Sequence, residues 1–99
     1  MQSYYPSSFE REMGCTADEL RGWLPHASGG RAIEWHEGGA VVSIDEGCAT
    51  LSWQTLLPRR IALIVLPRLQ VRIGARGVNE AAWQRFMKYF DLYTQRGGG

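Results

Sequence analysis

The chain has 99 residues, 44% of them hydrophobic and 11% aromatic, and its formal net charge is +1. This composition allows one compact domain with a buried core and excludes a disordered chain, which could not bury enough apolar surface to offset the entropy of ordering it. The longest apolar run, from Ile61 to Pro67, is far shorter than the roughly 20 residues that a helix needs to cross a bilayer. We therefore expect no membrane among the partners of this chain.

The N-terminal stretch MQSYYPSSFEREMG has no basic start followed by an apolar segment, so we expect no export signal and a cytoplasmic location. Cys15 and Cys48 are far apart in the sequence and lack CxxC spacing, which predicts two free thiols in a reducing compartment. Neither His26 nor His36 stands at a metal-ligand spacing from a cysteine. We expect no metal site and no cofactor.

Charge is distributed unevenly along the chain. Residues 1–50 carry three basic and eight acidic residues, a net charge of −5, whereas residues 51–99 carry eight basic and two acidic residues, a net charge of +6. In one small domain the two halves have to interleave, so we expect them to neutralise each other across the fold. A segregated basic face is the alternative.

Two capping-box patterns predict short helices in the N-terminal third. Ser7 and Glu10 form the first, which favours one helical turn carrying Phe9 and Met13 on one side.

The second pattern joins Thr16 and Glu19 and precedes apolar residues at helical spacing. It predicts a helix over residues 17–24, which Pro25 ends.

From residue 33 the apolar period changes to two. Alternation over 33–36, 42–44 and 49–54, separated by glycine-containing turns, predicts three antiparallel strands joined by hairpins. Trp35 and Trp53 alternate in phase with the aliphatic residues of these strands, so we expect both rings in the core.

The next apolar segment, residues 61–66, shows no alternation and lies between Pro58 and Pro67. Stiff β-branched residues without alternation favour a central strand that is covered on both faces. After Pro67 the alternation is strict, which places one set of side chains in the core and an arginine-bearing set on the outer face.

A long helix is predicted at the C-terminal end. Asn79 is a good N-cap, and an apolar stripe follows at helical spacing, made of Trp83, Phe86, Met87, Phe90 and Tyr93 or Thr94. Polar residues including Asp91 fall away from this stripe, so we expect them in solvent. Residues 1–96 are predicted to form a single domain and 97–99 a flexible tail.

These elements predict an α+β fold. We expect an antiparallel sheet of four to five hairpin-connected strands, a short helical N-terminus, and a long amphipathic C-terminal helix packed on one face of the sheet.

The strongest functional candidate is a set of five arginines, since alternate residues of a strand lie about 7 Å apart, close to the spacing of successive phosphates. The set consists of Arg59, Arg60, Arg68, Arg72 and Arg76. It predicts a small non-enzymatic binding or interaction protein whose partner is an unknown protein or an anionic molecule, with nucleic acid one alternative and a homodimer another.

Four alternatives remain. The C-terminal Arg96-Gly97-Gly98-Gly99 resembles the tails of ubiquitin-like and sulfur-carrier proteins, which implies a carrier with an activated terminal carboxylate. Cys15 and His26 would give an enzyme a nucleophile and a base. A space between helix and sheet would bind a small apolar ligand, whereas exposure of Tyr89, Leu92 and Tyr93 would mark a partner or dimer surface.

Overall fold

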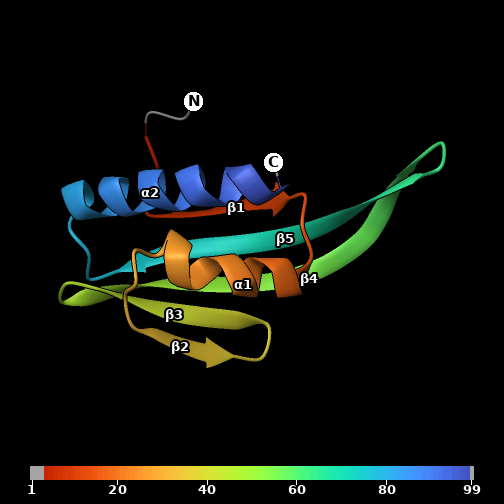
Figure 1. The fold of residues 1–99 in the computed structure, drawn as a ribbon. Coiled ribbons are helices and arrows are strands. Elements are labelled where there is room, and N and C mark those ends of the chain that lie inside the picture. The colour runs from red at the N-terminus through yellow and green to blue at the C-terminus, as the bar shows by residue number, and fades with distance from the viewer. Residues whose placement is uncertain (1–3, 99) are drawn as a thin grey trace.

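The computed structural model describes residues 4–98 and the side chains of residues 4–94. Five antiparallel strands form one sheet, and two helices lie on the same face of it (Figure 1). The elements are β1 (Ser8–Met13), α1 (Ala17–Ala27), β2 (Ile33–His36), β3 (Gly39–Ile44), β4 (Gly47–Ile61), β5 (Ile64–Arg76) and α2 (Glu80–Gly98). The α+β class and the long C-terminal helix are confirmed.

The sheet has the strand order β1-β5-β4-β3-β2. Three hairpins connect β2 to β5 in succession, and β1 closes the far edge by pairing with β5 from Ser8 opposite Gly74 to Met13 opposite Leu69. Tight turns make this local order possible, because Gly38 and Asp45 both take positive φ between adjacent strands.

The first predicted helical turn is wrong, because residues 8–13 form the edge strand β1. Phe9 and Met13 point toward the helices, and so does Arg11 between them, whose guanidinium binds the carboxylate of Asp91 on α2. A charged residue at an inward position interrupted the apolar alternation that would have identified the strand.

The second predicted helix is confirmed and is longer than expected. Thr16 Oγ1 accepts the backbone N–H of Glu19, and the Glu19 carboxylate accepts the N–H of Thr16, so the capping box is complete. Helix α1 continues through Pro25 to Ala27. Pro25 lies in the last turn of the helix. The N–H that proline lacks therefore removes only one hydrogen bond near the helix end.

The core lies between the two helices and one face of the sheet. The predicted stripe of α2 is confirmed, since Trp83, Phe86, Met87 and Phe90 are all buried. They pack with inward side chains of the strands and of α1, including Leu20, Leu24, Val42, Ile44, Leu51, Leu69, Val71 and Ile73. Asp91 is the exception to the prediction, because it is buried rather than solvated.

The two strand tryptophans lie at the margin of this core. Trp53 is half-buried against it, but Trp35, on the edge strand β2, remains 39% exposed. The prediction of a core position for Trp35 is therefore wrong, since Arg21 of α1 covers the ring in place of an apolar side chain, with its guanidinium 4.9 Å from the ring centroid.

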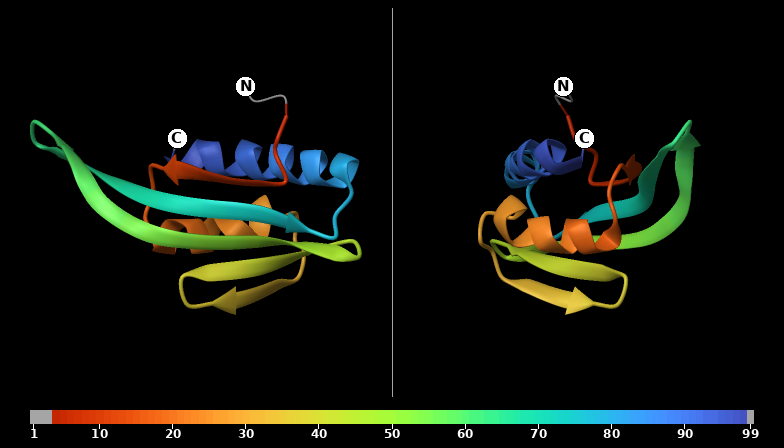
Figure 2. Two further views of the ribbon diagram at one scale, coloured as in Figure 1. Left: turned by 180° about the vertical axis from the view of Figure 1, so that it is seen from behind. Right: turned by 45° about the vertical axis from the view of Figure 1, so that its right-hand side comes forward.

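The β4–β5 hairpin extends well beyond the other strands, as the two views in Figure 2 show. We call residues 57–66 the arm. The predicted central strand at 61–66 is wrong, because Ala62 and Leu63 form the turn at the tip of the arm. Within the described residues the two strands of the arm pair only with each other there, and no third strand lies beside them. The missing alternation therefore reflects a segment exposed on both faces instead of one covered on both.

Within the described residues no helix is long and apolar enough to cross a membrane. Helix α2 is described as far as Gly98, whereas Gly99 and the side chain of Arg96 lie outside the described part of the chain. The predicted flexible tail and the carrier alternative thus stay predictions.

Candidate interaction surfaces

The face of the sheet opposite the helices is uncovered and polar, and it carries three of the five predicted site arginines. Arg68, Arg72 and Arg76 alternate along β5, which turns all three side chains to this outer face. The geometry predicted from the strand period is correct for these three residues. Their electrostatic surroundings differ from the prediction.

Two of these arginines are neutralised by glutamates of β1, the strand that sequence analysis missed. Arg68 donates from Nε and Nη2 to the two carboxylate oxygens of Glu12, both at 2.9 Å. Arg72 donates from Nε and Nη2 to one oxygen of Glu10, at 3.0 and 2.7 Å. These hydrogen bonds hold the pKa of Glu10 and of Glu12 below the usual range, so both carboxylates stay charged at neutral pH. The outer face therefore presents paired charges and no continuous cationic row.

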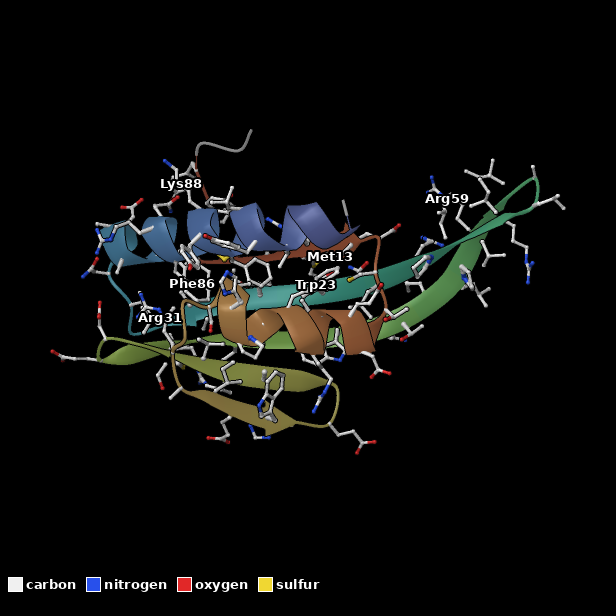
Figure 3. All side chains as sticks on the ribbon, in the orientation of Figure 1. Met13, Trp23, Arg31, Arg59, Phe86 and Lys88 are labelled. Carbon is white, nitrogen blue, oxygen red and sulfur yellow. The ribbon has the colours of Figure 1, made fainter. Side chains whose placement is uncertain are left out.

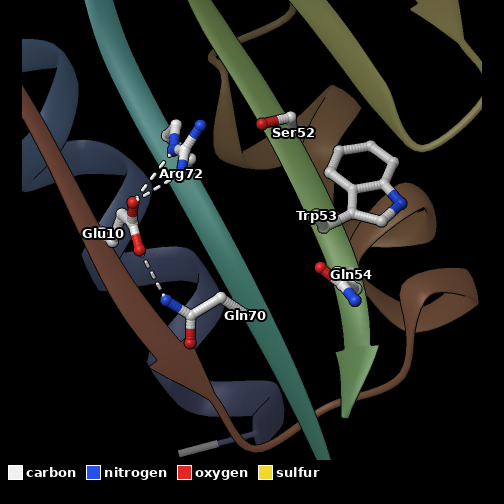
Figure 4. Close-up of a pocket in the computed structure, with 6 residues that line it drawn as sticks. All are labelled: Glu10, Ser52, Trp53, Gln54, Gln70 and Arg72. Carbon is white, nitrogen blue, oxygen red and sulfur yellow. Dashed lines mark hydrogen bonds and ion pairs between the residues drawn. The ribbon is translucent and has the colours of Figure 1, made fainter.

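A shallow hollow of about 160 Å³ lies on this face between β1, β5 and β4 (Figure 4). Glu10 occupies one side of it, with one oxygen bound to Arg72 and the other accepting from Gln70 Nε2 at 2.8 Å. Ser52 and Gln54 of β4 line the opposite side. Because Glu10 already neutralises Arg72, the hollow suits a small polar group better than an anion.

The remaining predicted arginines lie elsewhere. Among the described residues Arg59, Arg60 and Arg76 form no ion pair, and Arg59 is near enough to Glu12 to add a minor attraction. Arg59 and Arg60 are neighbours in the arm, so their side chains leave on opposite faces of the ribbon (Figure 3 labels Arg59). The structure thus divides the predicted set between the outer face and the arm.

The arm carries the two most exposed large apolar side chains of the described chain. Leu63 is 100% exposed and Leu57 83%, and four further aliphatic side chains remain well exposed: Ile61, Ile64, Val65 and Leu66. A soluble monomer rarely exposes so many contiguous large apolar groups, and when it does they mark an interaction site. Their apolarity is visible in the sequence, but the cover expected on both faces of this segment is not provided by the described residues.

A second exposed group lies on α2, where Tyr89 and Leu92 are exposed and Tyr93 is half-buried. The Tyr89 and Tyr93 rings are tilted against each other at 4.6 Å between centroids, and His26 meets Tyr93 edge-on at 4.5 Å. These ring contacts within the chain cover part of the aromatic surface, so this group is a weaker candidate for an interaction site than the arm.

The residues of the enzymatic alternative are not brought together. Cys15 precedes the first turn of α1 and His26 lies in its last turn, so the helix separates them. Cys15 and Cys48 are both free thiols, and among the described residues no cluster of three metal-ligating side chains occurs.

We expect only one thiol of the native protein to react with a disulfide reagent at about pH 8. Burial, helped by the charge of Glu19, raises the pKa of the Cys15 thiol to about 11, whereas Cys48 is half-buried on the outer face. Thiol titration by absorbance should count one reactive group in the native state and two after unfolding. Fast reaction of both native thiols would show that Cys15 is accessible and would revive it as a nucleophile.

The packing between α2 and the sheet does not support the alternative of a small apolar ligand at that place. Trp83, Phe86 and Phe90 stack along the inner face of α2, at 5.8 and 6.3 Å between successive ring centroids, and fill the position that such a ligand would take.

No protein-family model matches the chain, and a search of curated proteins finds none that resembles it.

Proposed function

We propose that this chain is a non-enzymatic interaction protein that binds its partner through the arm. The observation that carries the proposal is the exposure of six large aliphatic side chains on a ribbon that projects from the body of the domain. Burying such side chains in an interface yields far more free energy than any paired charge on the outer face, because each fully buried aliphatic group contributes about 2 kcal/mol.

Charge favours a partner surface with negative potential. Residues 47–79 contain five arginines and no acidic residue, and two of these arginines, Arg59 and Arg60, flank the apolar part of the arm. Arginine is favoured at interfaces, where its planar group pairs with carboxylates. We therefore place the contact with an anionic partner at the arm instead of at the arginines of β5.

The separation of Cys15 from His26 supports the non-enzymatic part of the proposal.

The proposal predicts that capture of partners from a lysate of the native cells depends on the arm. Immobilised wild-type protein should retain partners that are lost from Ile64→Asp, because a buried aspartate without a counter-ion is costly in an interface. Leu92→Asp is the matched control, since Ile64 and Leu92 are both 57% exposed and Leu92 lies on α2. Quantitative mass spectrometry of the bound fractions measures the result. Equal capture by wild type and Ile64→Asp would rule out the arm as the binding site.

A further inference from the structure

Taking the proposed function as its basis, we infer that the occupant of the arm is a second copy of this chain, with the two arms running antiparallel about a two-fold axis. A two-stranded ribbon alone is marginally stable in water and needs a further strand or a packed face. Residues 4–98 give the arm neither, because β1 accompanies β5 only at residues 69–74 and β3 accompanies β4 only at residues 47–52.

The register of the arm defines one self-complementary side. Arg59 pairs with Leu66 and Ile61 with Ile64, so these four side chains share a face, whereas Arg60 and Val65 share the other. Counted over both faces and the tip of the arm, the exposed parts of the six aliphatic side chains amount to roughly 400 Å² of apolar surface, of which the self-complementary side supplies only a part. Each partner in a standard interface contributes roughly 800 Å². The main chain of the arm and the body of the second copy have to supply the remainder.

An antiparallel arrangement returns each tip to the body of the partner. The arm extends about 16 Å over its five residues from 57 to 61. The end of the body from which it projects holds the first turn of α1, which carries Asp18 and Glu19 (Figure 1). Met13 and Trp23, both half-buried, lie toward the same end (Figure 3). An arm from the second copy therefore meets carboxylates for its arginines and an apolar area for Leu63.

Other occupants fit these observations less well. Nucleic acid is bound through many phosphate contacts, and the arm offers only Arg59 and Arg60. A lipid interior would leave the backbone groups on both open edges of the ribbon without hydrogen bonds. Pro58 and Pro67 at the base of the arm remove donors there and limit open-ended strand addition, which favours a closed pair over a fibre.

The test is the mass of the purified full-length protein by light scattering and sedimentation equilibrium, from about 1 to 100 μM. We expect twice the 11.1 kDa of one chain. Ile64→Asp should raise the dimer dissociation constant by about 100-fold or more, and Leu92→Asp should leave it unchanged. Arg59→Gln together with Arg60→Gln should weaken the dimer and remove most of its dependence on salt. Circular dichroism and thermal melting verify that each variant is folded.

A monomeric wild type over this whole range overturns the inference, and so does a dimer that Leu92→Asp dissociates while Ile64→Asp does not. If the monomer loses lysate partners on Ile64→Asp, or binds phosphatidylserine vesicles through the arm, the proposed function survives with another occupant. A monomer whose capture is insensitive to Ile64→Asp removes both.

Discussion

Asp91→Ala is expected to lower the free energy of unfolding by about 3 kcal/mol, because it leaves the Arg11 guanidinium without its partner in a mostly buried position. The two Asp91 oxygens accept from Arg11 Nη1 at 2.5 Å and Nη2 at 3.2 Å, and Tyr5 Oη donates to the second oxygen at 2.5 Å. Only 22% of the Arg11 side chain and 11% of that of Asp91 are exposed. Urea unfolding followed by tryptophan fluorescence measures the loss.

Two variants calibrate this result. Tyr5→Phe removes one hydrogen bond and leaves the ion pair, so its expected cost is about 1 kcal/mol. Glu10→Ala breaks a solvent-exposed pair with Arg72 and should cost much less than Asp91→Ala. Equal effects of Glu10→Ala and Asp91→Ala would mean that the Arg11–Asp91 pair is solvated and does not hold β1 to α2.

The stability that the Tyr5 hydroxyl contributes to this cluster depends on pH. Burial, and next the hydrogen bond to Asp91, raise the pKa of Tyr5 from 10.0 to about 12. Since the folded pKa lies above the unfolded one, the neutral phenol stabilises the fold fully below pH 10, and this contribution is lost as the pH rises through 12.

The Arg11–Asp91 pair also explains why the sequence alone predicted neither β1 nor the burial of Asp91. Arg11 occupies an inward position of β1 and Asp91 a buried position of α2, and each is charged where the pattern requires an apolar residue. The pair satisfies both groups only through a contact 80 residues apart in the chain, which no local pattern reveals. Elements whose alternation is uninterrupted, such as β5 from Leu69 to Ile73, were predicted correctly because burial follows the period directly.

The candidate site was predicted only in part, for a related reason. Strand period places Arg68 and Arg72 on one outer face, as observed, but it cannot place Glu10 and Glu12 beside them without knowing that β1 joins β5. The apolar run at 61–66 could not be placed either. Its composition shows that these side chains need a covering surface, but it does not show which surface covers them. The described part of the chain supplies no surface that covers this segment, which is the physical reason for placing that surface in a partner.

Gly47→Ala is expected to destabilise the fold by about 3 kcal/mol. Gly47 begins β4 where the chain passes closely over the end of β5, and a Cβ atom there would overlap the carbonyl oxygens of Arg76 and Gly77. These are backbone atoms of a paired strand, so the overlap can be relieved only by moving the hairpin itself, from the Cys48–Arg76 pair onward.

Gly22→Ala is the matched control, with the opposite sign. Gly22 lies on the exposed side of α1 with nothing within 4 Å of the added Cβ, so the change should stabilise the protein by about 1 kcal/mol through helix propensity. Thermal unfolding of both variants separates close packing at the root of the hairpin from the general effect of replacing glycine. A Gly47→Ala variant as stable as the wild type would show that β4 and β5 are not in close contact there, and the arm that they extend would lack a fixed base.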